Sequence, residues 1–110
     1  MDLSKEGIII LYNNPRKGGR YSDAWYKESD EGVLVEVNAV EGALQKMGIR
    51  HRVAGVSRLT DIYPILCGNS ERIVFNLVES LEGSPHDVNF VPAVCLAGGK
   101  GCTGNTSNCL

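Results

Sequence analysis

Short, strongly apolar runs alternate with polar and amphipathic stretches along this chain. The first run lies in segment 7–13 (GIIILYN), where consecutive apolar residues indicate a strand buried on both faces, as in a parallel sheet. The second run, Ile73–Phe75, is β-branched and aromatic and predicts another buried strand over 73–78. Asn13 follows the first run and Glu79 the second, so polar side chains are expected at the carboxyl ends of both strands.

Residues 29–48 show the clearest helical periodicity. Ser29 or Asp30 is expected to cap the helix at its N-terminus, and Gly48 to end it. Gly42 in the interior costs about 1 kcal/mol relative to alanine, which suggests a close approach to the sheet. One face of the helix carries the apolar residues Val33, Val37, Val40, Leu44 and Met47.

Two further elements follow this helix. Segment 49–56 (IRHRVAGV) alternates polar and apolar residues, which predicts a less buried strand at an edge of the sheet. Segment 57–68 (SRLTDIYPILCG) predicts a helix capped by Ser57 and kinked or split at Pro64.

The last third of the chain completes the pattern. Segment 89–97 predicts a helix with Pro92 in its first turn, and 100–104 a last short strand. Strands and helices thus alternate, which predicts an α/β fold: a small parallel sheet of about four strands with helices on both faces. The 110 residues fit a single domain.

Residues Pro15–Asp30 are polar and exceed the normal connection between a strand and a helix, so a long loop is predicted there. Two interpretations stay open. The segment is either a disordered insertion or a loop that orders when it meets a ligand or partner. Its aromatic residues, Tyr21, Trp25 and Tyr26, argue against full disorder.

Composition excludes several classes of function. The net charge of −2 gives no electrostatic footprint for nucleic acid, and no apolar run approaches the roughly 20 residues of a membrane helix. The polar N-terminus is unlike a signal peptide, so a cytoplasmic location is expected. The four cysteines lack CxxC spacing, so no metal site is predicted. Phosphate-binding glycine motifs and GxSxG are also absent.

Candidate binding residues therefore come from the ends of the predicted elements. Tyr12 and Asn13 close the first strand, Asp30 opens the first helix, and Glu79 follows the third strand. In a parallel sheet these groups gather at the carboxyl edge, where ligands of α/β domains bind. Carboxylates there could hold an ammonium group through charge-assisted hydrogen bonds. The alternatives are a plain helix cap for Asp30 and a solvated loop acid for Glu79.

Four stretches, taken in order, resemble the N-terminal domain of the D-alanine–D-alanine ligase family of ATP-grasp enzymes. FNLVESLEG (75–83) is similar to the family's FNLxEG strand end, and VPAVCLAGGKGCTGNTS (91–107) follows as its proline-containing helix and strand do. ILYN (10–13) and SDEGVLVEVNAVEGALQKMGI (29–49) agree in the front half.

This resemblance implies a three-layer, Rossmann-like pre-ATP-grasp domain that forms one wall of a ligase active site. An acid at the start of the first helix contacts the amino group of the first D-alanine in that family, and Asp30 matches its position. Glu79 matches a residue that supports the same region, while Gly18 and Gly19 are a weak match to glycines near the phosphates. The parent reaction would be ATP-dependent amide bond formation in the synthesis of cell-wall peptide precursors.

The chain also departs from the family. Lys100 and Cys102 stand where the family's GIPYTG strand has apolar and aromatic residues. The domains that hold ATP and magnesium would lie beyond Leu110, so this chain alone is expected to have no catalytic residues, no cofactor and no ligase activity. Its expected partners are those domains, a second copy in a dimer, and a D-amino acid. The alternative is a non-enzymatic interaction or oligomerisation module derived from the same domain.

Overall fold

The computed structural model describes residues 6–14, 24–67 and 70–103, with only the backbone for 24–31. Within these residues, four strands form one parallel sheet in the order β2-β1-β3-β4. The predicted α/β fold and parallel sheet are thereby confirmed, as is the edge position of the second strand. The strands are β1 (Ile8–Asn13), β2 (His51–Val56), β3 (Ile73–Leu77) and β4 (Gly101–Thr103).

The central strand β1 explains the unbroken apolar run near the N-terminus. Its neighbours are β2 on one side and β3 on the other. Residues 8–11 are all buried because their side chains alternate between two separate cores. Ile9 and Leu11 belong to one core, and Ile8 and Ile10 to the other.

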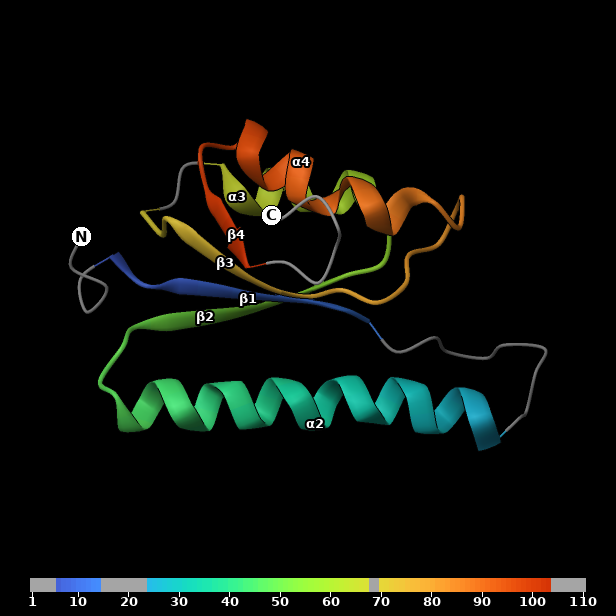
Figure 1. Ribbon diagram of the computed structural model, residues 1–110, viewed down its shortest axis with the longest axis horizontal. Helices are drawn as coiled ribbons and strands as arrows, with labels where there is room; N and C mark the ends of the chain where they lie inside the picture. Colours follow the sequence, from blue (N-terminus) through green and yellow to red (C-terminus); the bar gives the residue numbers. More distant parts are fainter. Residues whose placement is uncertain (1–5, 15–23, 68–69, 104–110) are drawn as a thin grey trace.

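One face of the sheet packs against the long helix α2 (Ala24–Lys46), as Figure 1 shows. Val33, Val37 and Leu44 of α2 are buried against Ile8 and Ile10 of β1. These helix residues belong to the predicted apolar stripe, whose spacing places them on one side of the helix.

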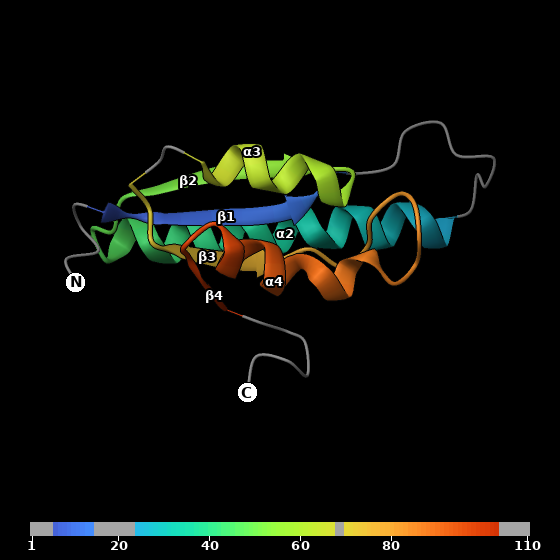
Figure 2. The ribbon, with the colours of Figure 1, turned by 90° about the horizontal axis from the view of Figure 1, so that it is seen from above.

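Shorter helices pack on the opposite face. The 3₁₀ turn η1 (Leu59–Asp61) leads into α3 (Ile62–Leu66), and η2 (Asp87–Phe90) leads into α4 (Val91–Ala97). Figure 2 shows α3 toward the β2 edge and α4 toward the β3–β4 edge. The core beneath them contains Ile9, Leu11, Val56, Ile62, Leu66, Val74, Val91 and Cys95.

The start of α2 corrects the prediction. The helix begins at Ala24 rather than at Ser29, so Asp30 is an interior helical residue and not the N-cap, and the predicted loop extends no further than residue 23. In Figure 1 the first turns of α2 extend beyond the end of β1. The apolar spacing that marks Val33 to Leu44 is interrupted by the polar Ser29 and Asp30, so it does not reveal these turns. Residues 15–23, with Gly18 and Gly19, lie outside the described part of the chain.

The other end of α2 confirms one expectation and corrects two. Gly48, at φ +69°, follows the helix as its stop, and its N–H donates to the Gln45 carbonyl at 3.1 Å. Met47 is exposed, although it continues the apolar spacing. A methyl group on Gly42 would meet nothing within 4 Å, so this glycine does not serve close packing on the sheet.

The segment around Pro64 also differs from expectation. The helical stretch divides between η1 and α3, before Pro64, which lies in the first turn of α3 where its lack of an N–H is tolerated. The predicted cap, Ser57, is not the capping side chain. The Asp61 carboxylate instead accepts from the backbone N–H groups of Ser57 and Arg58, at 3.0 and 2.9 Å.

Candidate functional site

The carboxyl ends of β1 and β3 are joined by Asn13. Its side-chain oxygen accepts the backbone N–H of Glu79 at 2.8 Å, and its amide nitrogen lies 3.5 Å from the Ser80 hydroxyl. Asn13 is only 4% exposed. The buried Asn13 amide fixes the backbone that carries Glu79. Asn13 therefore positions the acid and is itself too buried to contact a ligand.

The residues just before Glu79 are held in a similar way. The Asn76 side-chain oxygen accepts the Val78 N–H at 3.0 Å, and the Asn76 N–H donates to the Thr103 hydroxyl at 3.1 Å. Asn76 is buried, like Asn13. Side chains of β1, β3 and β4 thus fix the turn that leaves β3, and the position of Glu79 is set by the folded sheet.

Glu79 itself is exposed at this edge, next to α2. Partial burial raises the pKa of its carboxyl group, and the negative charge of Glu36 on α2 raises it further. Neither acid forms an ion pair with another residue in the described part of the chain. A carboxylate whose pKa is raised by a second negative charge marks a place where a cation is electrostatically favoured.

Tyr12 lies on the other side of β1. It is half-buried in the core under α2 and paired with Gly55 of β2. A methyl group on Gly55 would lie 3.0 Å from the Tyr12 hydroxyl and 2.1 Å from the Asn14 side-chain oxygen, so this glycine leaves room for both side chains. Among the predicted site residues, the structure therefore joins Asn13 to Glu79, while Tyr12 faces the β2 side.

The predicted pairing of Glu79 with Asp30 remains a prediction. The side chain of Asp30 lies outside the described part of the molecule, as do Gly18 and Gly19. The α2 acid that acts on Glu79 is Glu36, which sequence reasoning did not single out. Glu36 precedes the buried Val37, so it borders the apolar face. Only the packing of α2 on the sheet shows which strand end Glu36 approaches.

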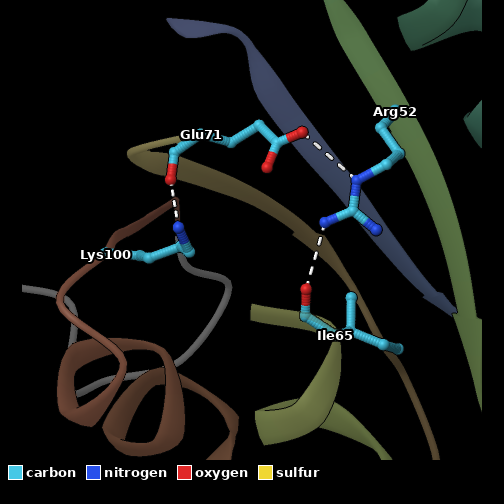
Figure 3. A network of polar contacts seen from close by, with 4 residues as sticks. All are labelled: Arg52, Ile65, Glu71 and Lys100. Atoms are coloured by element: carbon cyan, nitrogen blue, oxygen red, sulfur yellow. Dashed lines mark hydrogen bonds and ion pairs between the residues drawn. The ribbon is translucent and has the colours of Figure 1, made fainter. Parts of the chain in front are cut away.

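A second polar cluster lies at the opposite, amino-terminal edge of the sheet (Figure 3). Arg52 donates to the Glu71 carboxylate at 3.2 Å and to the Ile65 carbonyl oxygen at 3.1 Å. The Lys100 ammonium group donates to the backbone carbonyl of Glu71. Glu71 and Lys100 are each only 6% exposed. Lys100 is thus buried, as an apolar residue of the family's motif would be, because its charge is paired within the cluster. The cluster links β2 and α3 to the starts of β3 and β4.

Neither comparison with known proteins nor the side chains of the described residues identifies the class of this protein. No protein-family model, no curated protein and no solved structure matches the chain. Among residues 6–14, 24–67 and 70–103, no group of three His, Cys, Asp or Glu side chains is arranged to hold a metal ion. No helix in these same ranges is long and apolar enough to cross a membrane.

Replacing Glu79 by glutamine is expected to stabilise the fold at neutral pH. Because the folded-state pKa of Glu79 is raised above 4.5, stability falls as pH rises through the folded-state value, and this loss persists at neutral pH. Solvent screening should keep the gain of the variant below about 1 kcal/mol. Urea unfolding of the variant and the parent chain at pH 7 and at acidic pH measures this gain in the free energy of unfolding.

Glu82→Gln is the matched control, because Glu82 is an exposed acid in the same turn region. At pH 7 the Glu79→Gln variant should have a higher free energy of unfolding than the Glu82→Gln variant. This difference should disappear in acid, where Glu79 is protonated in the parent chain. Equal stability of the two variants at pH 7 would contradict the electrostatic interpretation of the site.

Proposed function

We propose that this chain is the N-terminal, substrate-side domain of a D-alanine–D-alanine ligase-like ATP-grasp protein, with the three-layer, Rossmann-like arrangement of a pre-ATP-grasp domain. In this function it forms the wall that receives the amino group of an amino acid. The parent reaction is ATP-dependent amide bond formation in cell-wall peptide synthesis. ATP and magnesium are held by domains other than this one.

The observation that carries the proposal is the environment of Glu79. Its backbone is fixed by Asn13, while its carboxylate lies exposed at the carboxyl edge of a parallel sheet, close enough to Glu36 for its pKa to rise. An ammonium group bound there would relieve the repulsion and form charge-assisted hydrogen bonds. The order of strands and helices also agrees with the family whose motifs the sequence resembles.

Titration of the chain with D-alanine, followed through its backbone amide NMR signals, tests this function. We expect signals of Asn13, Glu79 and Ser80 to shift together and to saturate in the millimolar range, because a single wall of a site provides only about 4 kcal/mol of binding free energy. The Glu79→Gln variant should bind at least about fivefold more weakly, a loss of about 1 kcal/mol.

N-acetyl-D-alanine is the control ligand, since it keeps the carboxylate and methyl group but has no ammonium group. It should leave these three signals in place. Equal shifts with both ligands would show that the carboxylate edge does not recognise the amino group. The absence of any shift at tens of millimolar D-alanine would exclude binding by this domain alone.

A further inference from the structure

Tyr12 carries a hydroxyl group that the described part of the fold does not use. Its ring packs in the core beneath α2, and its hydroxyl lies over Gly55, where a methyl group would stand 3.0 Å away. No residue in the described ranges forms a hydrogen bond with this hydroxyl. Because the hydroxyl of a tyrosine packed in a core normally has a hydrogen-bond partner, this one is available to a ligand.

Asn14 places a hydrogen-bond acceptor beside this donor. Its side-chain nitrogen donates to the Ser57 hydroxyl at 3.1 Å, and its side-chain oxygen lies over Gly55. A methyl group on Gly55 would collide with that oxygen, so the donor and the acceptor converge on the same glycine. A carboxylate next to an N–H group, as in the last residue of a peptide, matches this pair of partners.

Glu79 lies on the same, α2-facing side of the sheet but beyond the other side of β1. Leu77, two residues before it, packs in the core under α2, and Glu36 of α2 acts on the Glu79 carboxylate. The Tyr12 hydroxyl instead lies over β2. Neighbouring strands are about 4.8 Å apart, so with β1 between β2 and β3 the two groups are separated by about 10 Å along the carboxyl edge.

This separation sets the length of a ligand that contacts both groups. Hydrogen bonds of about 2.8 Å at its two ends leave roughly 5 to 7 Å for the ligand itself. One extended residue spans at most about 3.5 Å, and two span about 7 Å. A single amino acid is therefore too short to reach from Glu79 to Tyr12, whereas a dipeptide is long enough.

We propose that Tyr12 recognises the carboxylate of the ligand whose ammonium group is bound at Glu79, and that this ligand is a zwitterion of dipeptide length. The Tyr12 hydroxyl donates to the carboxylate, and the Asn14 side-chain oxygen accepts the N–H of the ligand's last residue. Gly55 leaves the room that both side chains occupy. The inference rests on the proposed function, because it starts from ammonium binding at Glu79.

Glycine and diglycine test the length of the ligand, because both are zwitterions without side chains and they differ by one residue. Titrations of the parent chain are followed through its backbone amide NMR signals. We expect diglycine to bind about tenfold more tightly than glycine and to shift the signals of Tyr12 and Gly55 in addition to that of Glu79. Equal affinities would overturn this inference and leave ammonium binding at Glu79 intact. No shift with either ligand at tens of millimolar would overturn both.

Tyr12→Phe tests the role of the hydroxyl while keeping the packed ring. It should reduce the affinity for diglycine about tenfold, because the lost hydrogen bond goes to a charged group, and leave the affinity for glycine unchanged. Tyr63→Phe is the matched control, since Tyr63 is an exposed residue of α3 on the opposite face of the sheet. This control should bind both ligands as the parent chain does. A Tyr12→Phe variant that binds diglycine as tightly as the parent chain would refute the role assigned to Tyr12.

Discussion

Replacing Gly7 by alanine is expected to lower the free energy of unfolding by about 3 kcal/mol. Gly7 enters β1 at φ +84°, a conformation that side-chain-bearing residues rarely adopt. A Cβ atom there would lie 2.9 Å from the Arg50 carbonyl oxygen, which also accepts the Ile8 N–H. Because the obstacle is backbone, relief would require the start of the β1–β2 pairing to shift.

Gly42→Ala is the matched control for this prediction. Its surroundings are open, and the same added methyl group should raise the free energy of unfolding by about 0.5 to 1 kcal/mol. Urea unfolding at concentrations where the chain is monomeric measures both variants. A loss below about 1 kcal/mol for Gly7→Ala would show that the entry to β1 is far more adaptable than its geometry indicates.

Replacing Glu71 by glutamine is expected to lower the free energy of unfolding by about 2 kcal/mol at neutral pH. The change removes a buried negative charge that Arg52 and Lys100 surround, so these two cations lose their counter-charge. Glu82→Gln again serves as the control, because an exposed acid should change stability by no more than about 0.5 kcal/mol.

The pH dependence of Glu71 identifies the cause of that loss. Burial opposes ionisation, but the hydrogen bond from Arg52, the bond from its own backbone N–H and the charges of Arg52 and Lys100 together hold the pKa of Glu71 below 4.5. Its contribution is therefore complete above pH 4.5 and is lost as pH falls through the folded-state pKa. The difference between the parent chain and Glu71→Gln should shrink in acid. A difference independent of pH would indicate a packing effect instead.

Strand and helix order could be predicted because burial leaves periodic marks in the sequence. The continuous run 8–11 reflects a strand between two cores, and the four-residue and three-residue spacing from Val33 to Leu44 reflects a helix on one of them. Where the apolar spacing is interrupted, as it is by Ser29 and Asp30, the sequence does not show how far the helix extends. The first turns of α2 lie before this interruption, and the predicted helix therefore began at Ser29 instead of Ala24.

The site could be predicted only in part for a related reason. Asn13 and Glu79 follow buried strands, so their place at the carboxyl edge follows from the parallel topology. The bond between the Asn13 side chain and the Glu79 N–H depends on strand register, and the influence of Glu36 depends on how α2 packs. Burial of Lys100 likewise depends on Glu71, a partner distant in sequence that no local pattern identifies.

The central position of β1 has a consequence for how the chain folds. Ile8 must pair with His51 on one side and with Ile73 on the other, so β1 is synthesised before either of its partner strands. Such non-local parallel pairing makes folding slow, because the intervening loops must close before the contacts form. Until then the run 8–11 is an exposed, uncharged β-forming segment, the kind that drives aggregation. Refolding yield should accordingly be governed by how quickly β3 reaches β1.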